Sequence, residues 1–112
     1  MRAYYHKDFK KSYKKLPKKL QAQADEKILL FLEDPYNQLL NNHALTGKYM
    51  GYRSIKISGD WRAIYQLEIS DLAYFVKIGT HSNLYKWPRD DEVASRKRFI
   101  TTHAKAVKNL DI

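Results

Sequence analysis

The chain has 112 residues, of which 21 are lysine or arginine and 12 are aspartate or glutamate, giving a formal net charge of +9. This length suits one domain, and the positive balance favours a polyanion or an acidic protein as partner, although a well-solvated basic surface gives the same count. The absence of cysteine excludes disulfides and thiolate metal sites, and the sequence has no secretion signal or membrane-span-length apolar run, so we expect a cytoplasmic protein.

The first third of the chain predicts a short strand and then a helical hairpin. Residues 2–6 have strand character, and Asp8 is a candidate N-cap for the first helix. Pro17 separates the two helices and Asp34–Pro35 ends the second. Apolar residues recur at helical spacing in both: Phe9, Tyr13 and Leu16, then Leu20, Ala24, Ile28 and Phe31.

Strand patterns follow in the middle of the chain. The residues of 52–57 alternate between apolar and polar, and further strands are predicted over 61–67 and 72–78, with turn signals between them. Connections this short require antiparallel neighbours. The expected fold is therefore α+β, with an N-terminal helical hairpin packed on one face of a small antiparallel β-sheet. A helix is also expected over 90–110.

Polar side chains gather near the uncovered sheet face or at strand ends: His43, Lys56, Asp60, Arg62, Lys77, His81 and Tyr85. This set contains no nucleophile-elbow serine, no glycine-rich phosphate loop and no histidine-rich metal spacing. It suits RNA cleavage, in which a base takes the 2′-hydroxyl proton, an acid protonates the leaving 5′-oxygen, and cations surround the phosphate. Plainer interpretations are also open, since a histidine after Gly-Thr is commonly a turn residue and a tryptophan on a strand is commonly core.

A metal site is a further alternative for the same residues. The side chains of His43 and His81 together with Asp60 offer ligand types that metal ions accept. The positive charges around them oppose a cation, so we expect no metal and no cofactor.

Three short motifs resemble the YafQ branch of the RelE/ParE superfamily of bacterial type II toxins. FKKSYKKLPKK is similar to the family's first helix and its Leu-Pro junction. NHALTGKYMGYRSIKISGDWRAIYQL resembles its His-x-Leu-x-Gly, Gly-Tyr-Arg and Asp-Trp-Arg-x-x-Tyr pattern, and IGTHSNLY resembles its Gly-Thr-His-x-x-Leu-Phe/Tyr pattern. The resemblance covers roughly residues 4–85 and implies a RelE-like fold and a metal-independent mRNA endoribonuclease that cleaves mRNA in the ribosomal A site.

The resemblance also implies roles for individual residues. His81 matches the main catalytic histidine, and His43 or Asp60 is implied as the base. Tyr85 matches an aromatic residue at the edge of the site. Lys56 and Arg62 resemble residues of RelE-like members and are implied on the phosphate. RNA binding is implied for three further residues: Arg53, Trp61 and Lys77.

The implied partners are an acidic cognate antitoxin, the ribosome and mRNA, with no membrane. Residues 86–112 extend beyond the family's usual end, with 7 basic and 4 acidic residues. We predict a helical extension of the single domain 1–112 there, which contacts RNA or antitoxin or covers the core edge. Two alternatives to the nuclease remain open: a ParE-like toxin acting on DNA gyrase without nuclease activity, and a catalytically decayed RNA-binding member.

Overall fold

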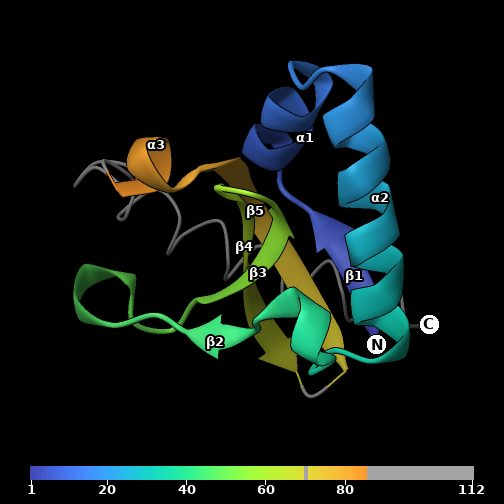
Figure 1. Cartoon of the computed structure of the whole chain (residues 1–112). Helices are drawn as coiled ribbons and strands as arrows, with labels where there is room; N and C mark the ends of the chain where they lie inside the picture. The colour runs from blue at the N-terminus through green and yellow to red at the C-terminus, as the bar shows by residue number, and fades with distance from the viewer. Residues whose placement is uncertain (70, 86–112) are drawn as a thin grey trace.

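The computed structural model describes residues 1–69 and 71–85 (Figure 1). Two short 3₁₀ helices accompany the regular elements, η1 (Gln38–Leu40) and η2 (Gly47–Tyr49). The predicted helix over 90–110 and extension 86–112 lie outside the described residues. The helices and strands are, in chain order, β1 (Arg2–Tyr5), α1 (Lys7–Lys14), α2 (Lys18–Glu33), β2 (His43–Ala44), β3 (Arg53–Ser58), β4 (Trp61–Ile69), β5 (Leu72–Thr80) and α3 (His81–Tyr85).

The five strands form one sheet in the order β1-β5-β4-β3-β2. Neighbours are antiparallel from β2 to β5, as the short connections require, and this confirms the α+β fold class. The outer strand β1 instead pairs in parallel with β5, with Arg2 opposite Leu72 and Tyr5 opposite Phe75. A parallel pair needs a long connection between its strands, and here the helical hairpin and β2–β4 supply it.

The helical hairpin begins earlier than the sequence predicts. The N-cap of α1 is His6, whose Nδ1 accepts a hydrogen bond from the backbone N–H of Asp8 over 2.9 Å. Asp8 thus lies inside the first turn, where its negative charge favours the helix dipole. The difference arises because β1 stops at Tyr5, which leaves only one residue between strand and helix. Pro17 is the N-cap of α2, as its fixed φ predicts.

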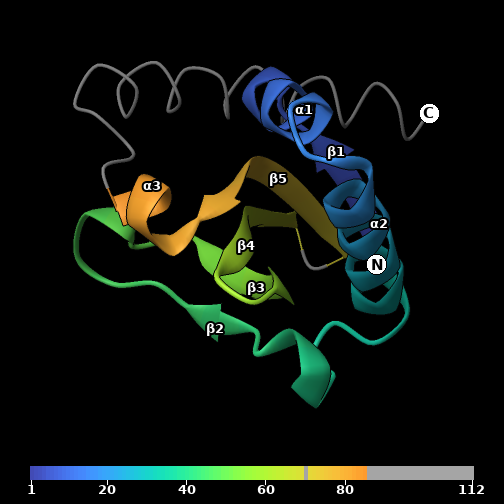
Figure 2. The same ribbon diagram turned by 45° about the horizontal axis from the view of Figure 1, so that its top comes forward.

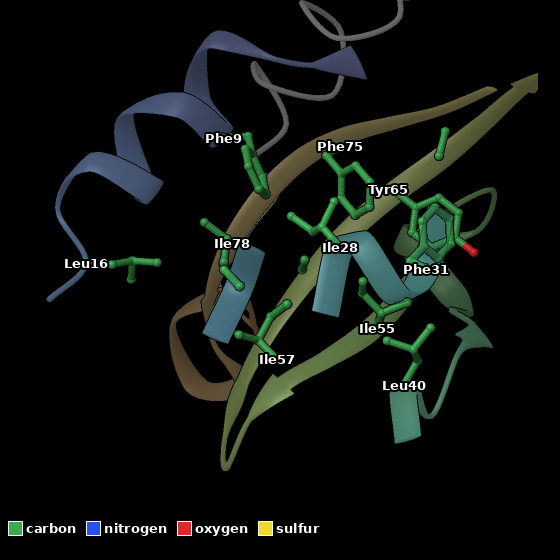
Figure 3. Packing of buried hydrophobic residues seen from close by; sticks show 13 residues of the cluster. Phe9, Leu16, Ile28, Phe31, Leu40, Ile55, Ile57, Tyr65, Phe75 and Ile78 are labelled. Carbon is green, nitrogen blue, oxygen red and sulfur yellow. The ribbon is translucent and has the colours of Figure 1, made fainter. Parts of the chain in front are cut away.

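The main core lies between the hairpin and one face of the sheet (Figure 3). Phe75 of β5 is fully buried, and its ring lies 5.5 Å from that of Phe31 and 5.7 Å from that of Phe9. Alternate residues of β3 and β4 complete the layer: Ile55, Ile57, Ala63 and Tyr65. The helical stripes and the strand alternation predicted from the sequence therefore meet in one core.

A second, smaller apolar cluster lies on the opposite face of the sheet. It comprises Tyr52, Ile64, Tyr74, Val76 and Leu84. A carboxyl also lies among the residues of this face: Glu68 is half-buried, its Oε1 has no hydrogen-bond partner, and burial raises the pKa of the carboxyl above its ordinary value of 4.5. The ionised form of Glu68 is therefore a source of instability rather than of stability.

We expect Glu68→Gln to raise the free energy of unfolding at pH 7. In the wild-type protein, the contribution of protonated Glu68 to the free energy of unfolding should be fully present below the ordinary glutamate pKa of 4.5. It should be lost as the pH rises through the higher pKa of the folded state, because the folded protein holds this proton more tightly than the unfolded chain does. Urea unfolding between pH 4 and 8 measures how the free energy of unfolding changes with pH, and this dependence should be weaker in Glu68→Gln. Glu26→Gln, at an exposed position on α2, is the control; equal slopes for Glu68→Gln and wild type would contradict the prediction.

Candidate active site

An open cleft of about 680 Å³ lies over β3 and β4 on the face away from the helical hairpin. The residues of one rim come from the segment around β2 and η2, and those of the other come from α3. Figure 2 shows how the ribbons of β2 and α3 are arranged around β3 and β4. The residues that line it come from all these elements: Asn41, His43, Leu45, Thr46, Gly47, Tyr49, Ser54, Arg62, Ile64, His81 and Leu84. The cleft thus brings together three of the predicted catalytic residues, His43, Arg62 and His81.

His81 is placed by the junction between β5 and α3. The strand continues through Gly79 and Thr80, beyond the predicted end at residue 78, and His81 begins the helix. A Cβ at Gly79 would lie 3.4 Å from Cδ2 of Leu84, which is an ordinary van der Waals contact, so α3 packs directly against this end of β5. The backbone N–H of His81 donates to the carbonyl oxygen of Asp60 over 3.0 Å. The exposed His81 is therefore held beside the β3–β4 turn.

His43 stands on the opposite rim, in β2, where it pairs with Ser54 of β3. Its Nδ1 lies 2.8 Å from the carbonyl oxygen of Asn41. A carbonyl oxygen only accepts, so the imidazole donates through Nδ1–H, and Nε2 of the neutral ring carries the lone pair. Asn41 has a left-handed backbone with φ 45°, which asparagine tolerates better than most residues. His43 therefore presents a nitrogen that is able to accept a proton.

Two cations lie side by side on the cleft side of the sheet. Lys56 of β3 is exposed and pairs directly with Arg62 of β4, which is half-buried. The Nη1 atom of Arg62 is buried without a hydrogen-bond partner. Among the described residues neither cation has a salt bridge to a carboxylate. Their charge is thus available to an anion that enters the cleft.

The other predicted site residues lie around the cleft or away from it. Asp60 is exposed in the β3–β4 turn, next to His81 through the backbone bond above. Lys77 of β5 is half-buried opposite Ile64, outside the cleft lining. The backbone of Tyr85 ends α3, and its side chain lies outside the described part of the chain.

Arg53 and Trp61 lie on the other side of the sheet. The side chain of Trp61 packs against the main core, in line with the core interpretation of its strand alternation. Arg53 donates from Nε to Oδ1 of Asn42 over 3.0 Å, and its guanidinium lies 5.5 Å from the ring centre of Tyr36. Both side chains are thus engaged in packing, and neither lines the cleft.

The floor of the cleft and part of its rim are formed by residues that were not predicted from the sequence. Ser54 shares a face of β3 with Lys56, so strand alternation was the signal that pointed to it. Leu45 and Tyr49 form an apolar part of the rim, and Tyr49 Oη donates to the carbonyl oxygen of Leu84 over 3.0 Å. This bond ties the two rims together, and no sequence pattern predicts it.

Within 1–69 and 71–85, no three histidine, aspartate or glutamate side chains stand close enough to hold a metal ion. None of the helices in these same ranges is long and apolar enough to cross a bilayer. The cleft lining itself offers the imidazoles of His43 and His81 and the guanidinium of Arg62.

The known proteins that this chain resembles include toxins of the YafQ family. The sequence matches the family model of the bacterial toxin of type II toxin–antitoxin systems, YafQ, over residues 1–86. The crystal structure of YafQ from E. coli strain BL21(DE3) has 26% identity and a TM-score of 0.65, and the match covers 76% of this chain and 99% of that one. The toxin in the crystal structure of the E. coli DinJ–YafQ toxin–antitoxin complex has 26% identity and a TM-score of 0.58, and the match covers 74% of this chain and 94% of that one.

A more distant structure shares the fold. The YoeB/ParE toxin from Agrobacterium tumefaciens has 18% identity and a TM-score of 0.62, and the match covers 72% of this chain and 99% of that one. A search of curated proteins gives no match. The likeness to YoeB/ParE confirms the RelE/ParE-type fold predicted from the motifs.

Proposed function

The chain belongs to the YafQ family of bacterial type II toxins, and from that premise we propose that it is a ribosome-dependent endoribonuclease that arrests translation by cleaving mRNA in the A site. The observation that carries this proposal is the cleft, which places the imidazoles of His43 and His81 on opposite rims with the guanidinium of Arg62 between the elements that hold them. Phosphodiester cleavage requires one group that takes a proton, one that gives a proton and a cation near the phosphate, and imidazoles and a guanidinium are suited to these roles. The proposed place of action is the cytoplasm, where ribosomes are.

The proposed reaction is an acid–base transesterification. The 2′-oxygen attacks the adjacent phosphorus and loses its proton to the base, while the bond from phosphorus to the 5′-oxygen breaks. The leaving oxygen takes a proton from the acid, so the products are a 2′,3′-cyclic phosphate and a 5′-hydroxyl. We assign the base to His43, because its Nδ1–H is held by Asn41 and Nε2 is left to accept, and the acid to His81.

We assign the stabilisation of negative charge on the reacting phosphate to two cations of the sheet, Arg62 and Lys56. Arg62 lines the cleft and Lys56 stands directly beside it, so their positive charges stabilise the additional negative charge of the pentacovalent phosphate. Asp60, whose backbone carbonyl accepts from the N–H of His81, is assigned to positioning that residue rather than to taking the proton. Lys77, on the flanking strand, is assigned to the RNA backbone, and Tyr85 to the edge of the site.

The test is primer extension on a translated message in a cell-free system with the purified protein. New 5′ ends at in-frame codons that appear only while the message is translated are the expected result. Normal translation with no new ends would refute the nuclease, and the DNA gyrase supercoiling assay would then test the ParE-like alternative. Cleavage of the same RNA without ribosomes would refute ribosome dependence alone.

An acidic antitoxin is the proposed inhibitory partner, and an apolar groove between α1 and α2 is its proposed docking place. The groove has a volume of about 560 Å³ and is lined mainly by aromatic and aliphatic side chains, with Lys10 and Lys14 among them. Leu29 lies in it with 62% of its surface exposed. Apolar surface beside positive charge suits an amphipathic helix that carries acidic residues.

We expect Leu29→Glu to weaken antitoxin binding at least tenfold, because it removes apolar contact area and adds a charge that repels an acidic partner. Isothermal titration calorimetry with the cognate antitoxin measures the change. Leu39→Glu is the matched control, since Leu39 is 61% exposed and lies outside the groove. Equal affinities for the two variants would place the antitoxin elsewhere on the molecule.

A further inference from the structure

Ser54 is a buried hydroxyl on the floor of the cleft that none of the proposed catalytic steps uses. It lies in β3 between His43 of β2 and Ile64 of β4, and only 2% of its surface is exposed. Its Oγ has no hydrogen-bond partner in the described part of the protein. Buried hydroxyls are nearly always paired, so an unpaired one at the base of an open cleft points to a ligand that completes it.

A second unpaired donor lies on the same floor. Nη1 of Arg62 is buried without a partner, and Arg62 is the next cleft-side residue along β4 from Ile64. Leu45, Ile64 and Leu84, which also line the cleft, have hydrocarbon side chains, and neither Ser54 Oγ nor Arg62 Nη1 is bonded to another described residue. Two buried and unpaired hydrogen-bond donors therefore belong to residues that line the same cleft.

The chemistry of these donors selects the ligand. A serine O–H and a guanidinium N–H both donate to a phosphate oxygen, and an anion is also attracted by the charge of Arg62. A metal cation is repelled by that charge, and an apolar ligand leaves both donors unpaired. A serine side chain has three staggered positions about one bond, so its hydroxyl is able to turn toward a bound oxygen without backbone movement.

We propose that Ser54 is a positioning residue: its hydroxyl and Nη1 of Arg62 together hold a non-bridging oxygen of the RNA phosphate from below, between the imidazoles of His43 and His81. This inference rests on the proposed nuclease function and adds to it an uncharged protein ligand of the phosphate beside Arg62 and Lys56. Because His43 pairs with Ser54 across the β2–β3 ladder, the hydroxyl fixes the phosphate at a set place relative to the base.

The direct test is binding of adenosine 3′-monophosphate, with adenosine as the ligand that lacks the phosphate, by NMR titration. We expect Ser54→Ala to raise the dissociation constant for the nucleotide about tenfold, the usual effect of losing a hydrogen bond to a charged group, and to leave adenosine binding unchanged. Ser54→Thr keeps the hydroxyl and should restore binding. Ser58→Ala, on the same strand but outside the cleft lining, is the control.

Measurements of stability and of mRNA cleavage distinguish a failure of this inference from a failure of the proposed nuclease function. The Oγ has no partner in the described protein, so Ser54→Ala should not lower the melting temperature. Ribosome-dependent cleavage should fall about tenfold in this variant and recover in Ser54→Thr. Three results would overturn the inference without refuting the nuclease. They are a wild-type affinity of Ser54→Ala for the nucleotide, an equal loss of affinity for adenosine in this variant, and no preference of the wild-type protein for the nucleotide over adenosine. Phosphate binding that depends on Ser54 without cleavage supports the subsite and overturns the nuclease.

Discussion

Replacing His81 with alanine is expected to lower the rate of ribosome-dependent mRNA cleavage by about 10²–10⁴-fold, the usual contribution of a positioned general acid. The imidazole stands at the cleft rim at the first residue of α3, where its backbone N–H is bonded to Asp60. The bond uses the main chain, so alanine removes the ring and keeps the helix in place. The measurement is the yield of new 5′ ends over time by primer extension in cell-free translation.

The control is Ser82→Ala, the next residue of α3, which is also exposed. It should cleave at the wild-type rate, and both variants should have the far-ultraviolet circular dichroism spectrum of the wild type. Cleavage by His81→Ala at the wild-type rate would refute the assignment of the acid. Loss of activity in Ser82→Ala as well would show that α3 acts through its surface rather than through the imidazole.

Replacing Phe75 with alanine is expected to lower the free energy of unfolding by about 3–5 kcal/mol, a large part of the roughly 5–15 kcal/mol that holds a domain folded. The ring is fully buried where β5 meets both helices. It packs against aromatic neighbours at centroid distances of 5.4–5.8 Å: Tyr5, Phe9, Phe31 and Tyr65. Alanine leaves a cavity that the sheet on one side and the helices on the other are unable to close.

Urea denaturation measures this loss, and a graded variant guards against complete unfolding. Phe75→Leu removes roughly three carbon atoms and should cost about 2 kcal/mol at about 0.8 kcal/mol for each. Met50→Ala is the control, because Met50 is 76% exposed and surface changes usually stay within about 0.5 kcal/mol. A loss below about 1 kcal/mol for Phe75→Ala would mean that β5 is not the centre of the core.

The local elements were predictable because their signals lie within short stretches of chain. The break at Pro17 follows from one residue's fixed φ, and the buried stripe of α2 follows from apolar spacing. Element ends were less predictable: His6 replaced Asp8 as the cap, and β5 ran on to Thr80. These ends depend on which backbone groups find partners in other elements, and a local pattern does not contain that information.

For the candidate site too, the sequence was enough to identify some residues but not their arrangement. The motifs of the chain were sufficient to identify the toxin family and to point to His43, Arg62 and His81. Only the tertiary structure decided which residues face one another, because the strand register sets both the partner of each residue and the sheet face it occupies.

That register places Ser54 beside His43 and turns Trp61 into the core, away from the cleft. It also pairs β1 with β5 across most of the chain's length. By itself, then, the sequence determined the elements, the family and the reactive groups, since these depend on local spacing and side-chain chemistry. The cleft was decided by long-range strand pairing, which joins residues that no short pattern connects.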